Sequence, residues 1–175
     1  SDLSNLLADI MVWGGEAFHE KPVFGVYNMG GIRAAFAKGK VTYGDVLNVA
    51  PFENHICFLT LTGEKTMQLF REMASVGGEG VSHSVKLVIT KDGKLRSATV
   101  NGKAIDPAGH YRIVTLDYLA QGNDKLEAFK AKTDVVSPQE QAYSVRYIIV
   151  NYFKNKAAKG ESVNAHVEGR ITYEN

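Results

Sequence analysis

The sequence predicts a single α+β domain over residues 1–175, with a mixed, largely antiparallel sheet and packed helices. Segments with helical spacing of apolar residues stand at the start, in the middle and near the end of the chain. Short apolar or alternating runs, bounded by turn residues, lie between them. Hydrophobic residues make up 45% of the chain and charged residues 22%, and no linker or repeat divides it. A chain of this length and composition can bury one core without disulfides or metals.

The charge balance and the apolar runs exclude two classes of partner. The formal net charge is +1, without a run of basic residues, so we expect no nucleic acid polymer as a ligand. The apolar runs are too short to cross a bilayer, so we expect no transmembrane segment. The only cysteine, Cys57, excludes an internal disulfide. The chain begins at Ser1 rather than methionine, which indicates either a removed leader or a trimmed chain.

The first third of the chain predicts three helical segments, a strand and a loop. Apolar residues from Leu3 to Met11 recur at helical spacing until a glycine pair at 14–15. Residues 23–27 predict a strand, and residues 34–37 favour a helix after the following loop. Residues 42–49 predict a short helix that ends before Pro51.

The middle of the chain predicts a buried strand, a helix and a β region. Residues 55–61 form a dense apolar run, after which Thr62 is a suitable N-cap for a helix ending at the glycines 77–78. Residues 85–90, 95–100 and 111–116 have strand character and are separated by turn signals. We expect these three strands to form an antiparallel meander.

The last third predicts a helix and a final strand. Ser137 and Glu140 make a capping box with Pro138 at the first helical position, and helical spacing continues to about residue 158. Gly160 ends this helix, and residues 167–173 predict a strand.

The loop between residues 28 and 33 is the first candidate for a binding site. Gly30 and Gly31 permit positive φ angles and a close approach of the backbone to a ligand, while Asn28 and Arg33 offer an amide and a guanidinium. An anion or a polyhydroxyl ligand suits this set. Alone, however, a glycine pair after a strand is more often a tight connection, and its spacing fits neither the dinucleotide-binding nor the Walker motif.

Six segments in order make the chain resemble the C-terminal domain of the 5′-nucleotidase family. The segments are residues 28–33, 42–45, 51–54, 61–63, 115–124 and 167–171. Each is weak alone, but their order and spacing extend over nearly the whole chain. The resemblance implies a domain that recognises the substrate, while a separate metallophosphatase domain with two metal ions performs the hydrolysis.

The resemblance also implies roles for individual residues. Asn28 and Arg33 match residues that face the phosphate and the ribose of a nucleotide. Phe52 and Tyr118 match the two aromatic residues that sandwich the base, and Asp124 matches the aspartate that holds the ribose hydroxyls. These roles are chemically coherent, because aromatic faces stack on bases and a carboxylate accepts hydrogen bonds from hydroxyls. Without the resemblance, the two aromatics would be interpreted as packing residues and Asp124 as a helix cap.

Two departures from the family pattern change the expected site. Tyr118 stands where phenylalanine is common, so its hydroxyl needs a partner or water. Residues 121–125 read Gln-Gly-Asn-Asp-Lys instead of Asn-Gly-Gly-Asp-Gly, which removes two glycines around Asp124. We expect Asn123 to be able to adopt the positive φ in their place.

The sequence contains no motif for the catalytic metals. It has neither Asp-x-His nor Gly-Asn-His-Asp/Glu, and its histidines are scattered. We therefore expect no catalytic residue, no metal site and no cofactor in this chain, with divalent metals only in a metallophosphatase domain or partner.

The function expected from the sequence is a stand-alone domain that binds a nucleotide or nucleoside phosphate and works with a metallophosphatase encoded elsewhere or cleaved away. The resemblance implies a periplasmic, cell-surface or secreted location. Two alternatives stay open: a non-catalytic module for ligand sensing or protein interaction, and an autonomous phosphatase.

Overall fold

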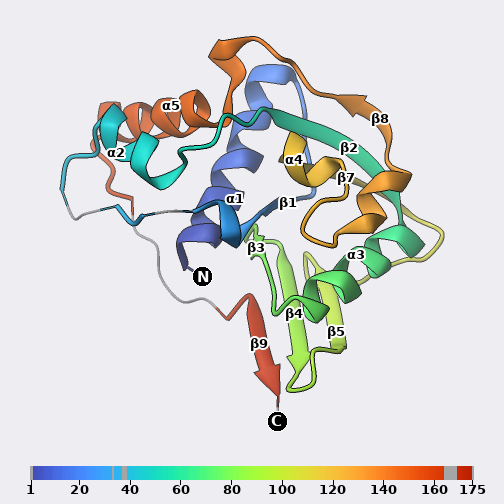
Figure 1. The fold of residues 1–175 in the computed structure, drawn as a ribbon. Helices are drawn as coiled ribbons and strands as arrows, with labels where there is room; N and C mark the ends of the chain where they lie inside the picture. Colours follow the sequence, from blue (N-terminus) through green and yellow to red (C-terminus); the bar gives the residue numbers. More distant parts are fainter. Residues whose placement is uncertain (1, 33, 37–38, 164–168, 175) are drawn as a thin grey trace.

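The computed structural model describes residues 2–32, 34–36, 39–163 and 169–174 and contains two mixed sheets (Figure 1). The larger sheet has the order β3-β1-β7-β2-β8 and is composed of β1 (Phe24–Tyr27), β2 (Ile56–Thr62), β3 (Gly80–Val81), β7 (His110–Leu116) and β8 (Thr133–Val136). The smaller sheet has the order β6-β5-β4-β9 and is composed of β4 (Val85–Thr90), β5 (Leu95–Val100), β6 (Lys103–Ala104) and β9 (Ile171–Glu174). In each sheet one pair, β1 with β7 or β4 with β9, is parallel and the other pairs are antiparallel. The predicted α+β class, with mixed and mainly antiparallel sheets, is confirmed.

The helices lie on both faces of the larger sheet. They are α1 (Asp2–Gly14), α2 (Tyr43–Val49), α3 (Gly63–Ser75), α4 (Asp117–Ala120) and α5 (Val145–Ala158). Four short 3-10 turns are η1 (Gly15–Phe18), η2 (Met29–Gly31), η3 (Glu127–Ala131) and η4 (Gln141–Tyr143). Helices α1, α2 and α5 cover one face, while α3, η3 and the smaller sheet cover the other (Figure 1).

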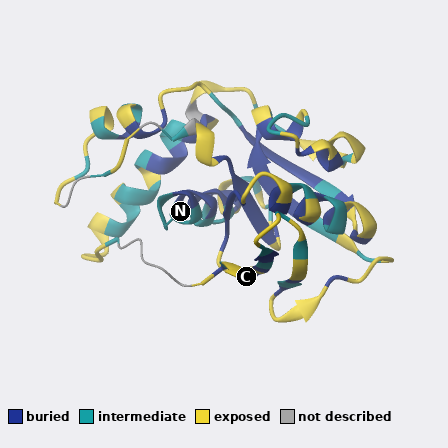
Figure 2. Cartoon of the chain, turned by 60° about the horizontal axis from the view of Figure 1, so that its bottom comes forward, coloured by how far each residue is buried: buried dark blue, intermediate teal, exposed yellow. Residues whose placement is uncertain are grey.

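The apolar run of β2 is explained by burial on both faces. Ile56 and Phe58 join the core formed with α1, α2 and α5, whereas Cys57 and Leu59 join the core formed with α3 and the smaller sheet. Successive side chains of a strand point to opposite faces, so a central strand between two cores is apolar throughout. The strands between the helical layers are accordingly the most buried part of the chain (Figure 2).

The predicted starts of α2 and α3 are confirmed. Thr42 accepts a hydrogen bond from the Asp45 backbone, and the Asp45 side chain accepts one from the Thr42 backbone, which completes a capping box. Thr62 accepts a hydrogen bond from the Lys65 backbone at the start of α3.

Three predictions of secondary structure are wrong. Residues 34–36, after the loop, are not helical. Strand β7 does not continue the meander of β4, β5 and β6 but lies between β1 and β2, because residues 113–116 are buried on both faces and need the centre of a sheet. The last helix starts at Val145 rather than near Ser137, since the Ser137 hydroxyl donates to the Ile56 carbonyl instead of capping a helix. The predicted final strand begins at Ile171, and residues 167–168 lie outside the described part of the chain.

An ion pair fixes α1 against β3. The Arg170 guanidinium, 7% exposed, donates to both carboxylate oxygens of Asp9 at 3.1 and 2.8 Å and to the Val81 carbonyl at 2.9 Å. Helix and strand approach so closely that a Cβ at Gly80 would lie 2.5 Å from the Ser4 carbonyl oxygen. Glycine is therefore required at this position, directly after Glu79.

Candidate functional site

The candidate site lies at one edge of the larger sheet, where four strands begin or end. β1 and β7 are parallel, so their carboxyl ends meet at this edge and are followed by Asn28 and by α4. β2 and β3 run the opposite way, with Ile56 opposite Leu116 and Gly80 opposite Tyr27, so the residues that precede these strands reach the same edge. Segments that are distant in the sequence are thereby brought together.

Asp124 is the centre of a hydrogen-bonded cluster at this edge. Its Oδ2 accepts a hydrogen bond from the Asn28 side-chain amide at 3.2 Å, and its Oδ1 accepts one from the Tyr118 hydroxyl at 3.2 Å. Asn28 is only 6% exposed, so its amide is fixed in direction. The nearby Asn123 amide donates to the Tyr118 carbonyl at 2.7 Å. The structure therefore brings together three residues that the sequence predicted for substrate binding.

The backbone at Asp124 is left-handed. Asp124 has a φ of 57° and Lys125 a φ of 63°, following Gly122 at 93°. Asn123, which the sequence analysis named as able to adopt a positive φ, does not do so, because the chain makes its turn at the next two residues. Aspartate tolerates this conformation, but lysine adopts it at a cost of about 1 kcal/mol or more.

The two predicted aromatic residues are exposed at the site edge. Tyr118, the second residue of α4, is 41% exposed. Phe52, which precedes β2, is 48% exposed. The Tyr118 hydroxyl has found its partner in Asp124, whose negative charge raises the pKa of the phenol. Met29 and Val76 are also more than one third exposed, which is unusual for large apolar side chains.

Glu79 is a residue of the site that the sequence analysis missed. It is 5% exposed, and its Oε1 accepts a hydrogen bond from the Met29 backbone at 3.3 Å. Burial raises its pKa to about 8, and the negative charge of Asp124 adds to the rise. Its Oε2 is buried and has no hydrogen-bond partner among the residues that the structure describes. A single glutamate between glycines carries no local signal, and its position follows only from the pairing of β3 with β1.

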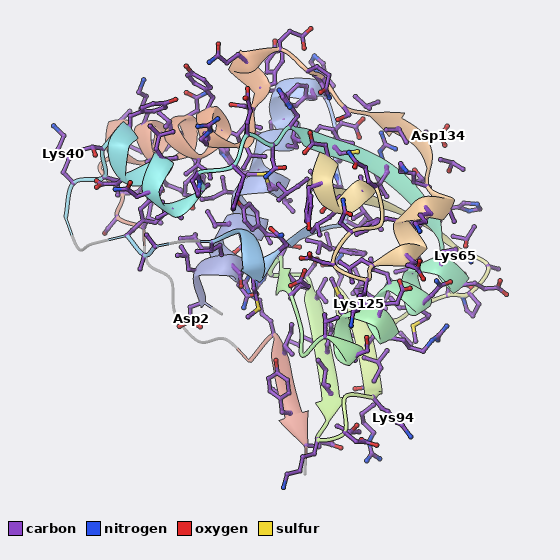
Figure 3. All side chains as sticks on the ribbon, in the orientation of Figure 1. Asp2, Lys40, Lys65, Lys94, Lys125 and Asp134 are labelled. Carbon is purple, nitrogen blue, oxygen red and sulfur yellow. The ribbon has the colours of Figure 1, made fainter. Side chains whose placement is uncertain are left out.

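A shallow pocket opens beside these carboxyl groups. It has a volume of about 240 Å³ and is lined by Val76, Glu79, Asp124 and Lys125. Lys125, labelled in Figure 3, lies in the loop between α4 and η3. Its cationic side chain lines this pocket. The pocket is thus formed by an apolar group, two acids and one cation, a set suited to a polar ligand with both hydroxyl and anionic groups.

The other predicted site residues have mixed outcomes. Gly30 and Gly31 form η2 with Met29 at the same edge, and Gly30 does not use the positive φ that glycine permits. Arg33 lies outside the described residues. Within the described ranges there is no group of three or more His, Cys, Asp or Glu side chains that could hold a metal ion. The same ranges contain no helix with the length and apolarity needed to span a membrane.

Comparison with known proteins gives the family. The family model for the 5′-nucleotidase, C-terminal domain, matches residues 1–131. The chain belongs to this family. The 5′-nucleotidase C-terminal match includes every site residue described above, from Asn28 to Lys125.

Individual relatives agree with this 5′-nucleotidase C-terminal assignment. Protein UshA of Escherichia coli K12 is 33% identical over 104 residues, which are 58% of this chain and 19% of UshA. An apyrase of Tabanus yao is 27% identical over 195 residues, covering 97% of this chain and 34% of the apyrase. The chain therefore spans from about a fifth to about a third of the length of these curated relatives.

Solved structures share the fold over the whole chain. The 5′-nucleotidase precursor of Thermus thermophilus superposes with a TM-score of 0.84 at 25% identity, covering all of this chain and 36% of the precursor. The NAD nucleotidase of Haemophilus influenzae has a TM-score of 0.74 at 20% identity, covers 99% of this chain and 33% of the nucleotidase, and supports the fold alone.

Proposed function

We propose that this 5′-nucleotidase C-terminal domain binds a nucleotide or nucleoside phosphate at the edge of its larger sheet. In this proposal the base stacks between Phe52 and Tyr118, and the ribose hydroxyls donate to Asp124. The phosphate faces Asn28, the glycine loop and Arg33. Stacking contributes about 1–3 kcal/mol per base and tolerates different bases, so the aromatic pair would provide affinity rather than base selection.

The observation that carries the proposal is the cluster around Asp124. Asn28 and Tyr118 follow the ends of different strands, and each donates to one oxygen of the same carboxylate. Each carboxylate oxygen has a second lone pair, so Asp124 can still accept ligand hydroxyl groups while its direction is fixed. Asp124 thus offers a fixed acceptor bonded to one exposed aromatic residue, Tyr118, while the second aromatic residue of the proposal, Phe52, is exposed in the segment that precedes β2.

We further propose that a metallophosphatase domain, in the same polypeptide or a separate one, performs any hydrolysis. The described residues offer no cluster of metal ligands, whereas metal-assisted phosphate hydrolysis requires several oxygen and imidazole ligands together. A periplasmic, cell-surface or secreted location belongs to the same proposal.

Isothermal titration with adenosine 5′-monophosphate tests the binding proposal. We expect Phe52→Leu and Tyr118→Leu each to weaken binding about tenfold or more, since each removes one stacking face. Tyr43→Leu is the matched control, because Tyr43 is 44% exposed but its ring lies against Tyr147 of α5. Unchanged affinity in both site variants, or no binding of any nucleotide by the wild type at millimolar concentration, would contradict the proposal.

Phosphate release distinguishes the proposed function from its alternatives. Addition of the metallophosphatase domain of a relative should increase turnover of the bound nucleotide. Binding without any increase would favour a ligand-sensing or interaction module. Metal-dependent release by this chain alone, titrated with Mn²⁺ or Zn²⁺, would contradict the assignment of catalysis to another domain.

A further inference from the structure

The unpaired oxygen of Glu79 requires an explanation. Buried polar side-chain atoms are nearly always hydrogen-bonded, and an unpaired one lowers the stability of the folded chain. Glu79 is only 5% exposed, and its Oε2 has no partner among the described residues. Because Glu79 also lines the pocket, the partner that its geometry lacks can come from a bound ligand.

Glu79 and Asp124 face the same pocket and have different hydrogen-bonding roles. Burial raises the pKa of Glu79 to about 8, so its carboxyl group is mainly neutral at pH 7 and carries a proton that it can donate. Because Oε1 accepts a hydrogen bond from the Met29 backbone, we assign this proton to Oε2. Asp124 accepts from two side chains and therefore acts as the acceptor. The pair offers one donor and one acceptor side by side.

We propose that Glu79 is a second sugar-binding residue of the pocket, donating from Oε2 to one hydroxyl of a vicinal diol whose other hydroxyl donates to Asp124. This inference rests on the proposed nucleotide site and adds its selectivity. A hydroxyl group is both donor and acceptor, so a diol matches a neutral acid and a carboxylate together. The pocket should therefore discriminate ribose from deoxyribose.

A divalent cation between the two acids is the competing occupant. It is disfavoured because a proton on Glu79 leaves only one negative carboxyl group, and Lys125 adds a positive charge at the pocket wall. Stabilisation of the wild type by Ca²⁺ or Mg²⁺ without nucleotide, absent in Glu79→Gln, would overturn the diol assignment.

Titration calorimetry with adenosine 5′-monophosphate and its 2′-deoxy and 3′-deoxy analogues at pH 7 tests the proposal. We expect the wild type to bind the ribonucleotide roughly tenfold more tightly than at least one analogue, because one hydrogen bond is lost. Glu79→Gln should keep this ratio, since its amide donates from the same position, whereas Glu79→Leu should lower it several-fold. Glu127→Leu, an exposed glutamate paired with Lys130 on η3, is the matched control.

The outcomes separate this inference from the proposed function. No nucleotide binding by the wild type would contradict the proposed function. Nucleotide binding with the same ribose preference in the wild type and Glu79→Leu would overturn only the role of Glu79. Should Glu79→Leu not fold, a crystal structure of the wild type with the ribonucleotide decides. A ribose hydroxyl at hydrogen-bond distance from Glu79 Oε2 supports the proposal, and a diol that contacts Asp124 alone overturns it.

Discussion

Two clusters of buried charge lie at opposite ends of the short strand β3, and they are built in opposite ways. Beyond its last residue, the Arg170 guanidinium meets the Asp9 carboxylate in a two-point ion pair and also binds the Val81 carbonyl. Before its first residue, Glu79 faces another acid, Asp124, and leaves one oxygen unpaired. In the Arg170 cluster a cation pairs with an acid and is hydrogen-bonded to it. In the Glu79 cluster two acids face each other, and one buried oxygen has no partner among the described residues.

The difference separates a structural cluster from the one that we propose to bind a ligand. A paired and hydrogen-bonded charge can remain buried without a ligand, and here it joins α1, β3 and the start of β9. A buried acid beside a second acid costs stability, and such perturbed groups are frequent at functional sites. The motif at residues 167–171 that contributed to the family resemblance thus contains, at Arg170, a residue that holds the fold rather than the ligand.

The largest expected effect comes from breaking the Arg170 cluster. Arg170→Leu should lower the free energy of unfolding by about 3–5 kcal/mol, because it removes the cation that pairs with Asp9 and the donor to the Asn5 and Val81 carbonyls. Urea denaturation measures this loss. The double variant Asp9→Leu/Arg170→Leu should recover part of it, and a single variant as stable as the wild type would show that the pair does not hold α1 to β3.

The next effect comes from neutralising the Glu79 cluster. The pKa of Glu79 is about 8 in the folded chain against an ordinary value of 4.5, so the folded state holds this proton more tightly than the unfolded state. The stability that the folded chain gains from protonated Glu79 is fully present below pH 4.5 and is lost as the pH rises through about 8. The wild type should lose roughly 3 kcal/mol relative to Glu79→Gln between about pH 5 and about pH 8.

Urea denaturation of both proteins across this pH range measures the difference. Subtracting the free energy of unfolding of Glu79→Gln from that of the wild type at each pH removes the contributions of groups that titrate alike in both proteins. Parallel pH profiles for the two proteins would mean that Glu79 is ionised in the folded state, and its description as a neutral donor would then fail.

The smallest effect concerns the strained turn that places Asp124. Lys125→Gly should raise the free energy of unfolding by about 0.5 kcal/mol, because glycine relieves the left-handed φ but gains freedom in the unfolded chain. Lys103→Gly, in strand β6, is the matched control and should destabilise the protein. A loss of stability in both variants would show that the turn stores no strain.

Local sequence patterns predicted most elements but failed where distant contacts decide the structure. The capping box at Ser137 is a valid local signal, yet its hydroxyl is used by Ile56, far away in the chain. The apolar sequence of β7 suits a strand in either sheet. Its position between β1 and β2 in the larger sheet is explained by the burial of both its faces, which the sequence does not show. Propensity alone contains neither contact.

The site shows the same division. The resemblance pointed to Asn28, Tyr118 and Asp124, and the structure brings these three together. Glu79 has no local signal, because its importance comes from Met29 and Asp124, which meet it only after β3 has paired with β1. The selectivity that we propose for the pocket therefore depends on Glu79, a residue that a comparison of motifs does not identify.

The most direct test of the central claim is an amide NMR titration of the wild type with adenosine 5′-monophosphate. The account predicts that shift changes concentrate at the edge formed by residues 28–31, 52–53, 79 and 118–125, while the amides around Asp9 and Arg170 stay unchanged. Shifts centred on the Asp9 and Arg170 cluster, or none at millimolar nucleotide, would contradict the assignment of the Glu79 and Asp124 pair to ligand binding.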